Sequence, residues 1–146
     1  MAILDAEVMF SDRQAITATA VSTNIWDSGP YGRAVGSAYP MLADAGKSTT
    51  TLLVQVVAAF NNLTSLRVDY QTSDDPTFAT GVTVLSSATK TLAELTAGAR
   101  FAPFVIPRGH KRYARLSYTV TGTAPTQGAI TAAASWSDDA SWFGKA

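Results

Sequence analysis

The sequence predicts an all-β protein folded as a β-sandwich or jelly roll. Short stretches rich in β-branched and aromatic residues recur along the chain, and Gly, Pro, Asn and Asp separate them at short intervals. No stretch has the strong 3.6-residue periodicity of an amphipathic helix. We expect about seven or eight strands, and turns at this spacing are typical of sandwiches and jelly rolls.

The clearest strand runs from Arg112 to Val120 and follows turn chemistry at Pro107-Arg108-Gly109. Its even-numbered side chains are mostly apolar, whereas its odd-numbered ones are polar or aromatic. This alternation predicts one face on a core and one face toward solvent or a partner. The expected core face is Ala114, Leu116, Tyr118 and Val120, and the opposite face is Tyr113, Arg115, Ser117 and Thr119.

The N-terminal third of the chain contains three further features. Apolar residues in 1–13 are spaced as in one helical turn, but an extended arm docking on the body fits them equally well. Residues 14–26 predict a strand that a turn at 27–30 closes. Residues 28–50 predict a long loop with four Gly and two Pro, and long loops in compact domains are usually functional or disordered.

Residues 49–60 form a continuous apolar and β-branched run, which predicts a central strand covered on both faces. The pair Asn61-Asn62 predicts a turn into a strand at 63–72, so we expect a β-hairpin here. The side chains of this strand alternate, with Leu66, Val68 and Tyr70 on one face and Arg67, Asp69 and Gln71 on the other. The later elements are a side-chain-capped turn at 73–76, a strand at 82–86, a short helix or loop at 89–98, a strand at 100–106, a turn at 122–128 and a strand at 128–136.

Length and composition predict one domain over residues 1–146, with an N-terminal arm (1–13), a sandwich body (14–136) and a C-terminal tail (137–146). The chain has no Cys, so neither a disulfide framework nor a cysteine zinc site is available. The 25 Ala and 19 Thr residues, with only 15% charged residues, favour a subunit of an assembly, because small and hydroxyl side chains pack closely without burying charge. An all-β domain that simply uses few charged residues is the alternative.

The charge balance and the hydropathy of the chain argue against nucleic acid and membranes as partners. The 11 basic and 11 acidic residues cancel, which argues against direct binding of nucleic acid or of a membrane surface. No apolar run approaches the roughly 20 residues of a membrane span. The first residues lack the basic segment of a signal peptide, so we expect a protein that is made and kept in a cytoplasm.

The chain offers little for catalysis, metal binding or a cofactor. Gly46-Lys47-Ser48 resembles the end of a P-loop, but the preceding glycine and the following helix are missing. His110 is the one histidine, and we expect it on the surface in a basic turn. A single histidine in such a turn makes a catalytic triad improbable. Asp74-Asp75 and Asp138-Asp139 lack the spaced ligands of an EF-hand. We therefore expect no enzyme activity, no catalytic residue, no metal and no cofactor.

A local positive patch stands out against the neutral chain. Five basic residues and no acidic one lie between Arg100 and Arg115. Tyr113 is the single aromatic side chain on that strand face suited to base stacking, so an acidic protein partner fits at least as well as a nucleic acid. Chance clustering on a solvated strand is the alternative. The candidate protein-interface residues are Arg108, Lys111, Arg112, Tyr113, Tyr31, Tyr39, Trp142 and Phe143.

Several pieces of the chain together resemble the Bordetella-phage-type capsid cement, or decoration, proteins of tailed bacteriophages. The resemblance spans roughly residues 4–135 and rests on the order and spacing of short segments. These are Phe10-Ser11-Asp12, residues 14–20 leading to Ser22-Thr23-Asn24, Gln71 to Asp75, Leu95-Thr96-Ala97-Gly98, and Pro107-Arg108-Gly109 followed by Lys111-Arg112-Tyr113 and Leu116 to Val120.

The resemblance implies a single jelly roll, an N-terminal arm and a structural role on the capsid exterior of the virion. It also implies that the partners are the major capsid protein and a second copy of the chain, with a dimer favoured. An alternative is a carbohydrate-binding module on a virion or cell surface, with Tyr31, Tyr39, Trp26 or Trp142 as stacking platforms. Sugar sites usually combine exposed aromatics with carboxylates or amides, and the aromatics here are scattered along the sequence.

Overall fold

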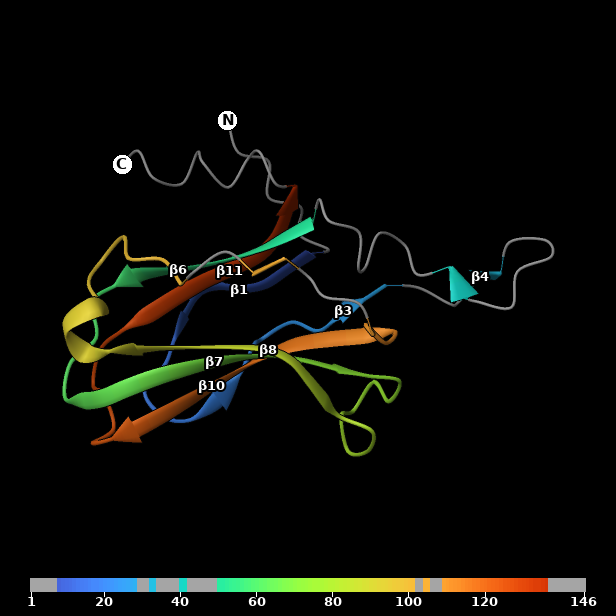
Figure 1. Ribbon diagram of the computed structural model, residues 1–146. Helices are drawn as coiled ribbons and strands as arrows, with labels where there is room; N and C mark the ends of the chain where they lie inside the picture. The colour runs from blue at the N-terminus through green and yellow to red at the C-terminus, as the bar shows by residue number, and fades with distance from the viewer. Residues whose placement is uncertain are drawn as a thin grey trace.

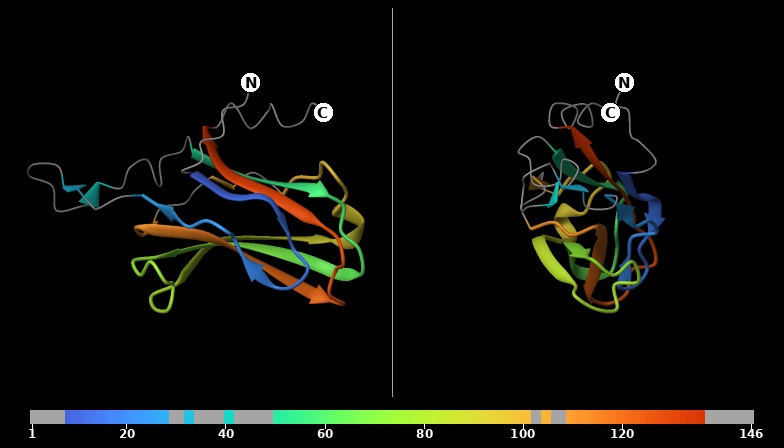
Figure 2. Two further views of the ribbon diagram at one scale, coloured as in Figure 1. Left: turned by 180° about the vertical axis from the view of Figure 1, so that it is seen from behind. Right: turned by 90° about the vertical axis from the view of Figure 1, so that its right-hand side faces the viewer.

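The computed structural model describes residues 8–28, 32–33, 40–41, 50–101, 104–105 and 109–136. In this part of the chain two antiparallel β-sheets pack face to face, and the layers are seen from the front in Figure 1 and from behind and from the side in Figure 2. The predicted all-β sandwich is therefore confirmed. Aligned packing of two sheets lets the inner side chains of both form one core.

The strands divide between the two main sheets as follows. Sheet A has the order β1 (Met9–Ala15), β11 (Ala129–Trp136), β6 (Thr50–Ala58) and β9 (Phe104–Val105). Sheet B has the order β2 (Ala20–Val21), β10 (Tyr113–Gly122), β7 (Leu63–Ser73) and β8 (Thr83–Thr91), with β3 (Trp26–Asp27) also paired to β10. The remaining elements are the 3-10 helix η2 (Leu92–Glu94) and the small pair β4 (Gly32–Arg33) and β5 (Pro40–Met41).

The order in which the chain visits the sheets is that of a jelly roll. It passes from β1 in sheet A to β2 and β3 in sheet B, then to β6 in A, β7 and β8 in B, β9 in A, β10 in B and β11 in A. Chain segments that are neighbours in sequence thus mostly lie in opposite layers (Figure 1). Double-sheet wrapping of this kind limits the number of exposed strand edges.

The predicted faces of the strand at 112–120 are confirmed in β10. Ala114, Leu116 and Tyr118 are fully buried in the core, whereas the side chains between them are partly exposed. The two sheets also share a polar contact in the interior, because the Tyr118 hydroxyl of sheet B lies 2.7 Å from Ser11 Oγ of sheet A. Burial raises the pKa of Tyr118 above its ordinary value, so the phenol stays protonated.

The central strand at 49–60 is also confirmed, but the hairpin that was expected to follow it is wrong. Leu52 and Leu53, whose side chains point to opposite faces, are both buried in β6. However, β6 pairs with β11 and β9, whereas β7 pairs with β10 and β8, so the turn at 61–62 connects the two sheets. A short turn and two apolar strands fit a sheet-to-sheet arch as well as a hairpin, and only the long-range partners decide between them.

Three further segments differ in extent from the prediction. The expected strand at 14–26 is split into β2 and β3, which both lie along β10. The strand at 82–86 continues to Thr91, and the helix or loop that was expected from 89 is reduced to η2. The strand at 100–106 is represented by β9 and by an isolated bridge from Arg100 to Gln55.

The chain ends and the long loop lie mainly outside the described residues. Within 1–13, residues 9–13 are extended as part of β1, and Phe10 is fully buried. Residues 9–13 therefore belong to sheet A. Within 28–50, the structure describes the β4 and β5 pair and the two end residues. The tail 137–146 lies outside the described residues.

Candidate protein interface

The solvent side of sheet B is dominated by hydroxyl and other polar side chains, and we call it the outer face. The register of β7 with its two neighbours places alternate residues of three strands on this side. Seven of these side chains are Ser or Thr, and most of them are exposed or partly exposed. The outer face consists of Ser65, Arg67, Asp69 and Gln71 in β7, Tyr113, Arg115, Ser117, Thr119 and Thr121 in β10, and Val84, Ser87, Thr89 and Thr91 in β8.

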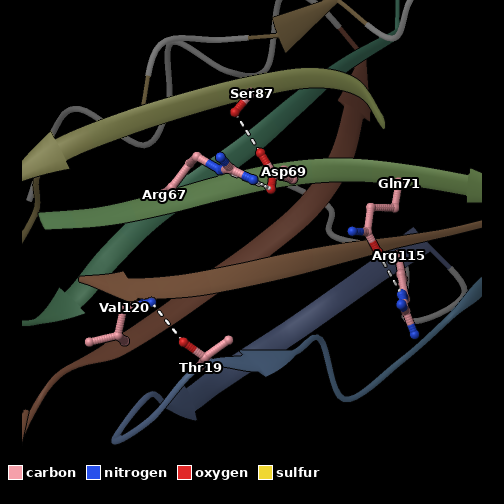
Figure 3. A network of polar contacts seen from close by, with 7 residues as sticks. All are labelled: Thr19, Arg67, Asp69, Gln71, Ser87, Arg115 and Val120. Carbon is pink, nitrogen blue, oxygen red and sulfur yellow. Dashed lines mark hydrogen bonds and ion pairs between the residues drawn. The ribbon is translucent and has the colours of Figure 1, made fainter. Parts of the chain in front are cut away.

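A buried carboxylate lies at the centre of the outer face. Asp69 is 2% exposed although it points away from the core. Its Oδ2 accepts hydrogen bonds from Arg67 Nε at 3.0 Å and Nη2 at 2.6 Å, and its Oδ1 accepts one from Ser87 Oγ at 2.5 Å (Figure 3). The charge is thus matched within the sheet, so a protein docking on this face meets no unpaired carboxylate.

A second polar contact lies beside it on the same face. Arg115 Nε donates to Gln71 Oε1 at 2.9 Å across the β10 and β7 pair (Figure 3). The Arg115 guanidinium also lies 4.4 Å from the centre of the Phe78 ring, which is a cation-π distance. Burial lowers the pKa of Arg115 from its ordinary value, but an arginine remains charged at neutral pH.

Of the predicted interface residues, the structure describes Lys111, Arg112 and Tyr113. Arg112 forms a two-pronged ion pair with Asp27, with Nε to Oδ1 at 2.9 Å and Nη2 to Oδ2 at 3.0 Å. Lys111 Nζ donates to the Gly81 carbonyl oxygen. The aspartate from a distant part of the sequence offsets part of the positive patch, which the local charge count did not reveal.

It remains a prediction that these three residues contact a partner. The structure places them at different parts of the surface. Tyr113 belongs to the outer face, whereas Arg112 holds β3 against β10 through Asp27. The other five predicted residues, Arg108, Tyr31, Tyr39, Trp142 and Phe143, lie outside the described residues.

The expectation of a surface histidine is wrong. His110 is 3% exposed, and a hydrogen bond of 2.7 Å joins its Nε2 to the hydroxyl of Tyr70. The imidazole ring also packs against the Trp26 ring, with 5.1 Å between ring centres. Burial lowers the pKa of His110 to about 4, against a weaker opposing effect of the Lys111 backbone, so the ring is neutral at neutral pH. The basic neighbours in sequence suggested exposure, but the turn directs the histidine inward.

Sequence reasoning placed Arg67, Asp69 and Gln71 on the polar side of their strand but did not single them out. The sequence shows polar residues alternating with apolar ones along 63–72. This pattern does not reveal that Ser87, from the next strand, donates a hydrogen bond to Asp69. In the described ranges no group of three or more His, Cys, Asp or Glu residues is arranged to hold a metal ion. The same ranges include no helix long and apolar enough to cross a membrane.

Comparison with known protein families identifies a match that covers most of the chain. The family model Bbp16 matches residues 10–134. The match begins in β1 and ends in β11, so it covers the sandwich itself. No curated protein matches the chain.

Proposed function

The chain belongs to the Bbp16 family and is a bacteriophage virion protein, and we propose that it binds the outer surface of the icosahedral head and cements neighbouring major capsid protein subunits. In this role the protein acts by adhesion, with no reacting group and no cofactor. The observation that carries the proposal is the outer face of sheet B. It spans three strands and is rich in hydroxyl groups, and the charges at its centre are already paired.

These properties suit docking on a protein shell. Hydroxyl side chains make hydrogen bonds with a partner at a small desolvation cost, whereas unpaired charges cost much more to bury. Arg67 is held against Asp69 before any partner arrives, so it loses little conformational freedom on docking. A contact on the order of 1,000 Å² per subunit is within reach of one sheet face and its flanking loops.

The head is stabilised because many copies of the protein bind to it. A DNA-filled shell is under internal pressure, and a subunit that bridges two capsomers adds buried area at the joint between them. Because many copies act together, individually weak contacts are sufficient. Tyr113, at one end of the outer face, is the predicted interface residue that best fits this geometry.

The test is co-sedimentation of the purified chain with expanded heads that lack it. The native chain is expected to pellet with the heads and to saturate them. The double variant Thr89→Arg/Thr119→Arg adds two cations that flank Arg67 in register across the outer face. We expect at least a tenfold loss of affinity, because the new charges and bulk prevent close docking.

The matched control is Thr96→Arg/Thr123→Arg, which adds the same charge at exposed positions in loops. This control is expected to bind like the native chain. Equal binding by both double variants removes the outer face from the interface, and failure of the native chain to pellet contradicts the cementing role.

The carbohydrate-binding alternative receives no support from the described aromatics. Trp26, one of its four proposed stacking platforms, packs against His110 and the core. A sugar binder would also remain in the supernatant of the sedimentation experiment.

A further inference from the structure

The loop that joins β7 to β8, residues 74–82, stands at one end of the outer face. In Figures 1 and 2 it lies beyond the end of sheet B, on the side away from sheet A. Its Phe78 is 6% exposed but lies outside the buried core cluster of the sandwich. The Phe78 ring instead covers the guanidinium of Arg115 on the outer face, at 4.4 Å. We call this loop, together with the first two residues of β8, the knob (residues 74–84).

A single carboxylate organises the knob from within. Asp75 Oδ1 accepts hydrogen bonds from Thr77 N at 2.8 Å and from Thr77 Oγ1 at 2.7 Å. Its Oδ2 accepts hydrogen bonds from the backbone N–H groups of Ala79 and Thr80, both at 3.1 Å. These bonds, the one from the Thr77 hydroxyl above all, lower the pKa of Asp75 to about 2, so the carboxylate is charged at neutral pH. The backbone of the knob is therefore held in one conformation by its own contacts.

The knob is also tied to the sandwich at its base. Ser73 Oγ donates to the Thr80 carbonyl oxygen at 2.7 Å, and Lys111 Nζ donates to that of Gly81. Phe78 has a φ of +55°, in the left-handed region that bulky residues rarely adopt. Strained backbone of this kind persists where the surrounding structure imposes it, and it is frequent at sites that bind partners.

The exposed surface of the knob is apolar and uncharged. Residues 76–84 contain no charged side chain. Val82 is 39% exposed and Val84 is 50% exposed, and Pro76 and Ala79 are exposed as well. Apolar side chains that are gathered on a preorganised support indicate a surface that a partner covers.

This apolar surface is continuous with the outer face. Val84 lies opposite Gln71 in the β8 and β7 pair, and Gln71 Oε1 accepts the hydrogen bond from Arg115 Nε (Figure 3). Phe78 covers the same guanidinium from the side of the knob. A partner that docks on the outer face therefore meets the knob at one end of the contact.

We propose that the knob inserts into an uncharged, apolar recess of the capsid protein subunit on which the outer face docks, with Val82 and Val84 buried in the contact. The choice of the capsid protein as the partner rests on the proposed function, whereas the chemistry of the recess follows from the knob. A charged recess would be desolvated against apolar side chains without a counter-charge. A sugar is disfavoured because the Phe78 ring, the aromatic group of the knob, is already buried. A preformed knob loses little conformational freedom on insertion, so it adds affinity and sets the orientation of docking.

Co-sedimentation with expanded heads that lack the chain tests the insertion. Val82→Lys/Val84→Lys is expected to lose roughly tenfold or more in affinity, because the recess would have to accept two unpaired charges. Val82→Ala/Val84→Ala stays neutral and removes only apolar contact, and it is expected to lose roughly fivefold. The matched control is Val57→Lys/Leu92→Lys, which changes two exposed apolar residues outside the knob and is expected to bind like the native chain.

Asp75→Asn tests whether the knob is preformed. The new amide replaces one acceptor oxygen by an NH₂ group, so the Ala79 and Thr80 backbone amides are expected to exchange hydrogen roughly tenfold faster while the sheets keep their protection. The affinity for heads is expected to fall roughly threefold, because the loosened knob must be ordered on docking. Unchanged exchange, or faster exchange with native affinity, contradicts the preformed knob.

The outcomes separate the two proposals. If the native chain does not pellet with heads, the proposed function fails and the assigned partner of the knob fails with it. If the native chain pellets and both Val82/Val84 double variants pellet equally well, the proposed function stands and the insertion of the knob is refuted. The alanine pair decides the matter even if the lysine pair folds poorly.

Discussion

Acidification is predicted to destabilise the sandwich through His110. The pKa of this residue is about 4 in the folded protein because of burial, whereas an unfolded chain has a histidine pKa of about 6.5. The unfolded state therefore binds the proton first, and stability is lost as the pH falls through the window from about 6.5 to about 4. At pH 4.5 the difference amounts to roughly 2 kcal/mol in the free energy of unfolding, since one pKa unit corresponds to about 1.4 kcal/mol.

The assay is urea unfolding at about pH 7.5 and about pH 4.5, compared between the native chain and His110→Gln. The glutamine removes the titrating ring but retains an amide that can bond the Tyr70 hydroxyl, which His110 bonds in the native chain. The native chain is expected to lose roughly 2 kcal/mol more than the variant over this pH interval. Equal losses would refute the assignment, since carboxylates common to both proteins would then explain the whole acid effect.

Two further substitutions test the interior of the sandwich, one through close packing at a glycine and one through a buried hydrogen bond. Gly128→Ala is expected to cost about 3 kcal/mol, because an added Cβ would lie 2.3 Å from the Phe60 ring at a backbone φ of +135°. Gly98→Ala, at φ +85° with no atom within 4 Å of the new Cβ, is the control and is expected to cost about 1 kcal/mol in the same urea experiment. Tyr118→Phe is expected to cost about 1 to 2 kcal/mol by removing the buried hydrogen bond to Ser11, and an unchanged unfolding midpoint would contradict that contact.

The local pattern of the sequence was sufficient to predict the buried side chains of a strand that has one apolar and one polar face. The alternation along 112–120 correctly predicted which side chains of β10 are buried, because side chains alternate between the core and the solvent. The turn at 73–76 was equally predictable, and Ser73 Oγ accepts a hydrogen bond from the Asp75 backbone amide. In both cases the relevant interactions lie within a few residues of one another.

What the sequence did not reveal depends on contacts between distant segments. The turn at 61–62 leads to an arch because the partners of β6 are contributed by β9 and β11, far along the chain. Asp27, which pairs with Arg112, is 85 residues away from it, so a count of neighbouring charges overstated the positive patch. His110 is buried because Trp26 and Tyr70 come together around it from two other strands.

A density map of the phage head with the chain bound tests the cementing role most directly. We predict density for the sandwich on the capsid exterior, bridging neighbouring capsid protein subunits, with the outer face of sheet B against the shell. A map in which that face points to solvent, or in which the chain is missing from the head surface, would contradict the proposed function.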